Sequence, residues 1–123
     1  MSRRLIRVLI RVPDIGRAAT FYAHALGSAG RRVSPGRHHF AVGTVEVACY
    51  DPVADGDLHD TAQSPSLWQL YVAVDDLETV QERVRDSGGS VAQPISTKPW
   101  GERSFYAADP FCNRICFVDA ATV

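Results

Sequence analysis

The chain has 123 residues, of which 46% are hydrophobic, and a formal net charge of −1. This length supports one domain with a single hydrophobic core, and the near-neutral charge gives no electrostatic reason to expect a nucleic acid or a membrane surface as a partner. The N-terminal residues lead directly into strand-like sequence without an apolar stretch long enough for a signal peptide or a membrane span, so we expect a cytoplasmic protein.

The first part of the chain predicts a strand, a helix and three further strands. Residues 7–12 alternate between an apolar face and a mixed face, as in a strand with one buried side. Asp14 then offers an N-cap, apolar side chains follow at helical spacing, and Gly27 is a natural stop. A tight hairpin at Gly43-Thr44 joins the last two of three strand-like stretches, which lie around residues 30–34, 38–42 and 45–50.

A polar segment separates this unit from the rest of the chain. Residues 52–66 are rich in aspartate, proline and small side chains, which predicts an exposed linker. The DGDLHD run within it invites a calcium interpretation. Its spacing has neither the glycine nor the closing glutamate of a helix-loop-helix calcium site, so we favour a solvated loop.

Residues 69–89 repeat the pattern of residues 7–27 at a constant offset of 62 residues. Asp76 takes the place of Asp14, and Gly88-Gly89 ends the second helix. Three strand-like stretches follow again, around residues 90–95, 103–108 and 114–118, with a final hairpin over residues 109–113. The duplication predicts one domain over residues 1–123, built from module one (4–51), the linker (52–66) and module two (67–119).

Three segments resemble the vicinal oxygen chelate superfamily, which contains glyoxalase I, extradiol dioxygenases, fosfomycin-resistance enzymes and bleomycin-resistance proteins. They are VLIRVPDIGRAATFYAHALG (8–27), YVAVDDLETVQERVRDSGG (71–89) and PWGERSFYAADPFCNRICFVD (99–119). The resemblance implies an α+β fold in which two β-α-β-β-β modules form a curled mixed sheet around an open cleft. The family usually has glycine where Cys112 stands, so we expect a strained or differently shaped turn there.

With helices on the outer faces, the mixed faces of the strands are expected to line the cleft. Strand alternation assigns twelve side chains to it: Arg7, Leu9, Arg11, Glu46, Ala48, Tyr50, Gln69, Tyr71, Ala73, Arg114, Cys116 and Val118.

The metal-dependent relatives hold a divalent ion with one ligand from each of four strands. The resemblance carries these positions onto Arg7, Ala48, Gln69 and Cys116. Arginine and alanine have no lone pair to donate, and an amide with a thiol makes a poor site for hard cations. We therefore predict neither a metal nor another cofactor.

A displaced metal site around Glu46 is an alternative, although an ion pair of Glu46 with Arg7, Arg11 or Arg114 is the simpler interpretation. The four histidines are scattered and are interpreted as structural or solvated. His38 and His39 are adjacent on one strand and point to opposite faces, and the others are His24 in the helix and His59 in the linker.

The three cysteines have no framework spacing, so we expect reduced thiols and no disulfide. Cys116 beside Arg7 and Arg114 could act as a nucleophile or redox sensor, but no histidine base accompanies it. We favour a small buried core residue. Cys112 and Cys116 alone are weak evidence for zinc.

Arginines and aromatic residues are the remaining signals, since they suit anionic and flat ligands. We predict a metal-independent small-molecule-binding protein, with no catalytic residue assigned and, from the resemblance, a homodimer formed side by side or by module exchange. The alternatives are a metal-dependent glyoxalase, lyase or dioxygenase using Glu46, Gln69 and Cys116, and a structural or regulatory module with a vestigial cleft. Trp68 is also expected close to the strands that border the cleft. The predicted ligand-binding residues are Arg7, Arg11, Glu46, Tyr50, Gln69, Tyr71, Trp100, Arg103, Tyr106, Arg114 and Cys116.

Overall fold

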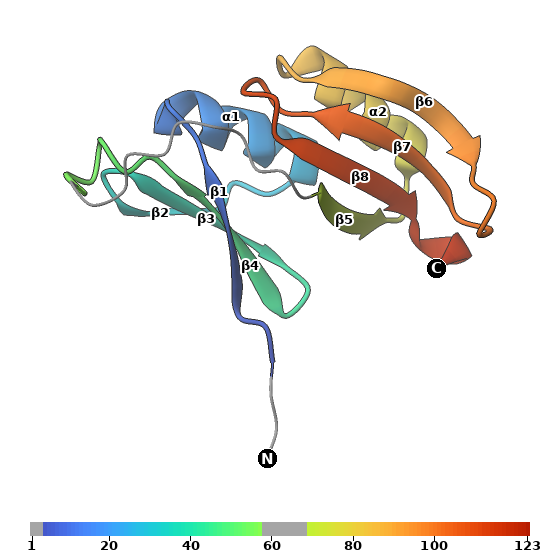
Figure 1. Cartoon of the computed structure of the whole chain (residues 1–123), viewed down its shortest axis with the longest axis horizontal. Coiled ribbons are helices and arrows are strands. Elements are labelled where there is room, and N and C mark those ends of the chain that lie inside the picture. Colours follow the sequence, from blue (N-terminus) through green and yellow to red (C-terminus); the bar gives the residue numbers. More distant parts are fainter. Residues whose placement is uncertain (1–3, 58–68) are drawn as a thin grey trace.

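The computed structural model describes residues 4–57 and 69–123, which form two four-stranded sheets and two α-helices (Figure 1). The predicted β-α-β-β-β order is confirmed in both modules. Module one comprises β1 (Arg7–Arg11), α1 (Ile15–Leu26), β2 (Arg31–Ser34), β3 (Arg37–Val42) and β4 (Val45–Tyr50). Module two comprises β5 (Gln69–Val74), α2 (Leu77–Asp86), β6 (Ser90–Thr97), β7 (Arg103–Ala108), β8 (Arg114–Asp119) and a final 3-10 turn, Ala120–Thr122.

Both helices begin at the predicted aspartates. The Asp14 carboxylate accepts a hydrogen bond from the Arg17 N–H at 3.1 Å, and the Asp76 carboxylate accepts one from the Thr79 N–H at 3.1 Å. Gly27 ends α1 in the left-handed conformation, with φ 68°. Helix α2 ends slightly before the predicted Gly88-Gly89, because Ser87 is its C-cap.

The two sheets have the same topology, with strand orders β1-β4-β3-β2 and β5-β8-β7-β6. In each module the first and last strands pair in parallel, and the other pairs are antiparallel. The registers also correspond: Arg7 lies opposite Glu46 in one sheet, and Gln69 lies opposite Arg114 in the other. The internal duplication of the sequence is therefore a duplication of strand pairing.

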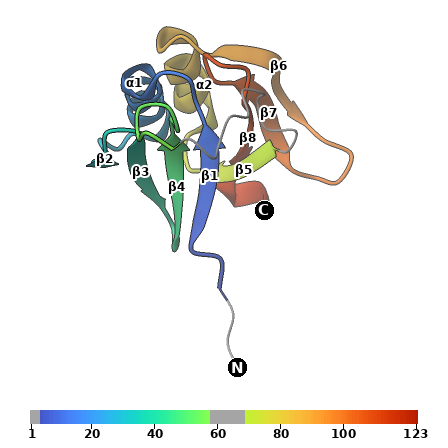
Figure 2. The same ribbon diagram turned by 60° about the vertical axis from the view of Figure 1, so that its left-hand side comes forward.

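The helices cover one face of each sheet and contact each other; α1 packs on β3 and β4, and α2 on β6, β7 and β8 (Figure 2). Their buried side chains belong to one continuous apolar cluster that includes Phe21 and Phe40 of module one and Val84, Phe105 and Phe117 of module two. The modules thus share a hydrophobic core. Within the described residues, no helix is long and apolar enough to cross a membrane.

A buried polar junction joins the modules at the turn before β8. The Tyr22 hydroxyl donates to the Asp109 carboxylate at 2.7 Å, and the Asn113 amide donates to Asp109 at 2.8 Å and to the Arg11 carbonyl at 3.2 Å. Burial, followed by the neighbouring Asp109 carboxylate, raises the pKa of Tyr22 well above its ordinary value. The Asp-Pro-x-x-Asn sequence of the predicted hairpin, residues 109–113, therefore holds the two modules together. In the same turn, Cys112 has φ 70°.

The described start of the predicted linker is anchored at Pro52 and Asp55, while Val53, Ala54 and Gly56 are exposed. Residues 52–56 form turns, and Asp51 and Pro52 are buried. The Asp55 carboxylate accepts hydrogen bonds from the Gly36 N–H at 2.6 Å and from the Ser34 hydroxyl at 2.9 Å. The rest of the linker, including His59, and Trp68 lie outside the described residues.

Candidate functional site

A pocket of about 950 Å³ opens on the face of the second sheet opposite its helix. Strand alternation produces this face: Phe105 and Phe117 of β7 and β8 belong to the helix-side core, while Tyr106 of β7 points to the pocket. The pocket is lined by Gln69, Tyr71, Ala92, Gln93, Lys98, Trp100, Tyr106, Ala107, Ala108, Cys112 and Arg114.

Five of the predicted ligand-binding residues line this pocket together. They are Gln69, Tyr71, Trp100, Tyr106 and Arg114. The strand registers explain the arrangement of its centre, because Tyr71 lies opposite Cys116 on one side of β8, and Tyr106 lies opposite Cys116 on the other. Burial, followed by the neighbouring Tyr71, raises the pKa of Tyr106. Two tyrosine rings therefore flank a buried thiol.

Sequence reasoning missed Lys98, which lines the same pocket and is only 9% exposed. Its ammonium group donates to the Ser96 hydroxyl at 2.5 Å and to the Ser104 carbonyl at 3.5 Å, and lies 4.9 Å from the centre of the Tyr106 ring. Among the described residues, Lys98 forms no ion pair with a carboxylate. Lys98 directly precedes Pro99-Trp100-Gly101 in the third segment that resembles the family, and this position was the one sequence signal for a pocket residue.

A tight turn fixes Lys98 and Trp100 at the end of the pocket. The Gly101 N–H donates to the Lys98 carbonyl at 2.9 Å, and the Lys98 N–H donates to the Glu102 carbonyl at 2.7 Å. Gly101 has φ 96°, a conformation that favours glycine. The indole N–H of Trp100 donates to the Glu102 carboxylate at 2.8 Å, so the ring is oriented although it is 59% exposed.

The lining is cationic and aromatic. Lys98 and Arg114 both carry a positive charge, and within the described part of the chain none of the lining side chains is acidic. Tyr71, Trp100 and Tyr106 supply three ring systems. Cations bind carboxylate or phosphate oxygens, and ring faces bind flat groups by stacking. The chemistry of this lining suits an anionic ligand with a flat body.

Cys116 lies beneath the pocket and is fully buried. Burial raises its thiol pKa, and the nearby Ser104 hydroxyl and Lys98 ammonium only partly offset this effect. Burial likewise raises the pKa of Cys49 to about 12. Both thiols are therefore protonated at neutral pH, which does not favour a nucleophilic role.

Glu46 belongs to a separate polar cluster on module one. Its carboxylate accepts hydrogen bonds from Arg31 and from His39 Nδ1, both at 2.8 Å, and lies 3.8 Å from Arg7 Nε. The hydrogen bond from Arg31, followed by that from His39, lowers the pKa of Glu46. The expected ion pair with Arg7 is present, whereas Arg31 and His39 were not anticipated. His39 Nε2 is buried without a hydrogen-bond partner among the described residues.

Tyr50 and Arg11 also belong to module one, and neither lines the module-two pocket. The Tyr50 hydroxyl donates to Asp57, and the guanidinium of Arg37 lies 4.7 Å from the centre of the Tyr50 ring. The carbonyl of Arg11 takes part in the module junction. The predicted ligand-binding residues of module one are thus engaged with module-one groups or with the junction.

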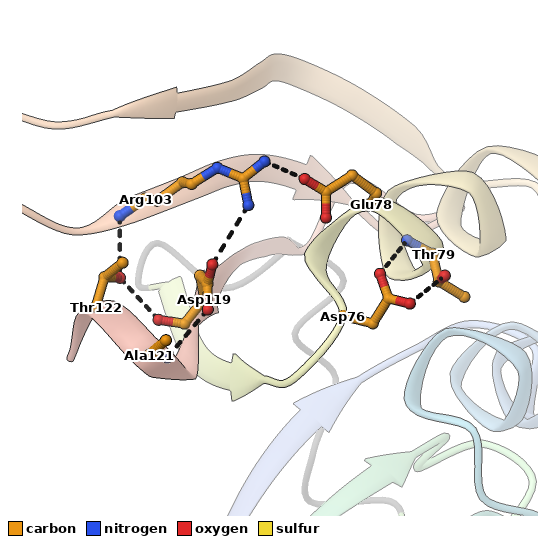
Figure 3. A network of polar contacts seen from close by, with 7 residues as sticks. All are labelled: Asp76, Glu78, Thr79, Arg103, Asp119, Ala121 and Thr122. Atoms are coloured by element: carbon orange, nitrogen blue, oxygen red, sulfur yellow. Dashed lines mark hydrogen bonds and ion pairs between the residues drawn. The ribbon is translucent and has the colours of Figure 1, made fainter.

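Arg103 points away from the pocket, although we predicted it as a cleft residue. Its guanidinium binds Glu78 of α2 and lies 3.3 Å from an Asp119 carboxylate oxygen (Figure 3). Its backbone N–H donates to the Thr122 hydroxyl at 3.1 Å. Arg103 and Tyr106 are separated by an odd number of positions on β7, so their side chains point to opposite faces. Arg103 therefore links β7 to α2 and to the end of β8.

The four positions carried over for a metal do not form a suitable donor set. Ala48 lies opposite Leu9, and Cys116 lies opposite Tyr71, so the two positions are equivalent in the two modules. Ala48 has no donor atom, Arg7 is a cation beside Glu46, and burial keeps the Cys116 thiol protonated. No group of three or more histidine, cysteine or acidic side chains in the described ranges could hold a metal ion. These residues do not fit the metal centre that the resemblance implies.

Comparison with known proteins gives a family match over most of the chain. A family model described as the Glyoxalase/Bleomycin resistance protein/Dioxygenase superfamily matches residues 4–117. A search of curated proteins found no significant match.

Solved structures share the fold at low sequence identity. A glyoxalase-related enzyme from Fulvimarina pelagi is 19% identical, with a TM-score of 0.82 over 96% of this chain and 88% of that one. A glyoxalase/bleomycin resistance protein from Albidiferax ferrireducens is 18% identical, with a TM-score of 0.78 over 94% of this chain and 97% of that one. A superfamily member from Sphaerobacter thermophilus is 19% identical, with a TM-score of 0.72 over 96% of this chain and 98% of that one.

Proposed function

Because the chain belongs to the glyoxalase/bleomycin resistance protein/dioxygenase superfamily, we propose that it is a metal-independent protein that binds an anionic or aromatic small molecule. The observation that carries the proposal is the module-two pocket. It combines three aromatic side chains with two cations and, among its described lining residues, no carboxylate. The cytoplasmic location and the homodimer remain parts of this proposal that rest on the family resemblance and the sequence.

The residues that line the pocket favour ligand binding over catalysis. None of the described lining residues is a histidine or an acid that could act as a general base. Cys116 beneath the pocket has a raised thiol pKa. The charged and aromatic groups that are present are suited to binding and orienting a ligand.

Ligand binding is tested by tryptophan fluorescence and thermal unfolding. The chain has two tryptophans, so Trp68→Phe leaves Trp100 as the single reporter in the pocket. Titration with an aromatic carboxylate should change the fluorescence of this variant. It should also raise the melting temperature by an amount that grows with ligand concentration, because the ligand binds only the folded state.

Two controls accompany this titration. Trp100→Phe, which keeps Trp68, should lose most of the fluorescence response. Prior removal of metal with a chelator should leave binding unchanged. Binding that requires added magnesium, manganese, iron or zinc would instead support a metal-dependent enzyme, and no response to any aromatic or anionic probe would contradict the proposal.

A further inference from the structure

The two cations of the pocket lie at opposite ends of its strand floor. The Lys98 ammonium is 3.5 Å from the Ser104 carbonyl near the start of β7, whereas Arg114 pairs with Ala108 at the end of β7. Ser104 and Ala108 are four positions apart on an extended strand, a distance of roughly 13 Å. The arginine side chain is long and can reach back toward Lys98, so the two charges can approach more closely than this.

An aromatic side chain lies midway between these ends. Tyr106 is two positions from both Ser104 and Ala108 on β7, and its ring lies under the Lys98 ammonium. Tyr71 follows on the other side of Cys116. The Lys98 ammonium therefore lies above the Tyr106 ring, and Arg114 belongs to the opposite end of the floor.

Neither pocket cation has a carboxylate partner among the described residues, in contrast to three arginines elsewhere in the described chain. Arg7 and Arg31 are ion-paired with Glu46, and Arg103 is ion-paired with Glu78 and Asp119. Neither Lys98 nor Arg114 forms such a pair with a described residue. The Lys98 side chain is largely buried, with the residue 9% exposed, and its ammonium contacts only neutral groups: the Ser96 hydroxyl, the Ser104 carbonyl and the Tyr106 ring. An anionic ligand would supply the missing charge.

We propose that the ligand of this pocket carries two anionic groups, one at each end of a flat aromatic or unsaturated body, and that Lys98 and Arg114 each bind one of them. This inference rests on the proposed function and narrows it from an anionic or aromatic molecule to a two-ended anion. Lys98, fixed by the turn before β7, binds its anion as a point charge. Arg114 is exposed and offers a planar fork that matches carboxylate or phosphate.

Calorimetric titration with matched probes tests the number of charges. The probes share a biphenyl body and carry carboxylates at both ends, a carboxylate at one end, or a neutral carboxamide. A fourth probe carries one carboxylate and one phosphate and distinguishes the two kinds of anion. The dicarboxylate should bind about tenfold to a hundredfold more tightly than the monocarboxylate, as expected for one additional charge-assisted hydrogen bond in the pocket.

Two variants and one control assign the charges to residues. Lys98→Met and Arg114→Met should each reduce the affinity for the dicarboxylate to about that of the monocarboxylate. Arg85→Met removes the same charge from the exposed end of α2 and should leave every affinity unchanged. The preference for two charges should also weaken with added salt.

The outcomes separate the inference from the function on which it rests. If the neutral and singly charged probes bind as tightly as the dicarboxylate, or if both pocket variants keep the preference, the two-ended anion is wrong and small-molecule binding stands. If none of the probes binds, both are wrong. Loss of the preference in both pocket variants, with Arg85→Met unaffected, supports the inference.

Discussion

Cys112 adopts a backbone conformation that side chains with a Cβ rarely occupy. Its φ is 70°, in the left-handed region, and it lies in the turn whose Asp109 and Asn113 join the two modules. A left-handed residue with a Cβ costs roughly 1–2 kcal/mol relative to the right-handed conformation. The resembling family usually has glycine here, which adopts this conformation without that cost.

Replacing this residue should therefore stabilise the protein. Cys112→Gly is expected to increase the free energy of unfolding by about 1 kcal/mol, because the strain at positive φ is relieved. Urea denaturation measures the effect as a higher midpoint at an unchanged slope. Cys112→Ala is the matched control: it removes the thiol but keeps the Cβ, so its stability should stay within about 0.5 kcal/mol of the parent. Equal stabilisation by both variants would show that the thiol, and not the backbone, is responsible.

At the scale of elements, charged groups connect the first turn of α2 to the end of the second sheet. Arg103 of β7 binds Glu78 of α2 and Asp119 at the end of β8, as Figure 3 shows. The side-chain hydrogen bond from Arg103 lowers the pKa of Glu78, and the side-chain and backbone hydrogen bonds of Thr79 lower that of Asp76. Both carboxylates also lie at the helix N-terminus, where negative charge is favourable.

These lowered pKa values predict acid destabilisation. An ordinary glutamate titrates near 4.3 in the unfolded chain. Since the folded pKa of Glu78 is lower, its contribution to stability is fully present above that value and is lost as the pH falls through the folded pKa. We expect the melting temperature to fall below roughly pH 4.5.

A variant of the same helix turn tests this assignment. Glu78→Gln should melt at a lower temperature than the parent at neutral pH, and its melting temperature should fall less steeply on acidification. Circular dichroism melts across the acidic range measure both effects. Asp86→Asn, at the other end of α2, should retain the steep fall of the parent protein. A Glu78→Gln profile parallel to that of the parent would remove this ion pair from the explanation.

The whole molecule depends on close packing between the modules. Gly89, just after α2, lies against Phe21 of α1: a Cβ at this glycine would be 2.5 Å from the Phe21 ring and 2.8 Å from the Ala108 carbonyl. Its φ is not positive, so the requirement is for space. Together with the Tyr22–Asp109 hydrogen bond, this contact packs the two modules directly against each other.

Filling this space should weaken the packing of both modules. Gly89→Ala is expected to lower the free energy of unfolding by about 1–3 kcal/mol, because the Phe21 ring and the Ala108 backbone must shift. Gly16→Ala is the control, since its Cβ would meet only an Asp14 oxygen at 3.7 Å. That helical substitution should be neutral or stabilising by up to about 1 kcal/mol. Urea unfolding of the two variants, followed in parallel, makes the comparison; equal stability would contradict the close packing.

The order and type of the elements followed from local sequence. Alternating apolar residues, the N-cap aspartates Asp14 and Asp76, and the glycines after each helix are short-range signals whose energies do not depend on distant parts of the chain. The repeat at an offset of 62 residues then predicted two equivalent modules. The resemblance supplied the arrangement of those modules, and the expected strand pattern was confirmed in both sheets.

The tertiary structure decided which polar groups are paired and which face the pocket. Arg103 and Tyr106 were both expected in the cleft, although strand alternation lets only one of them face it, and the structure places Arg103 against Glu78. Lys98 was missed because its burial comes from the fold of its turn against β7. The burial and the charge partners of a side chain depend on residues that are distant in the sequence, and local sequence patterns carry no information about them. The sequence by itself thus determined the two modules, and only their folding determined which cations stay unpaired.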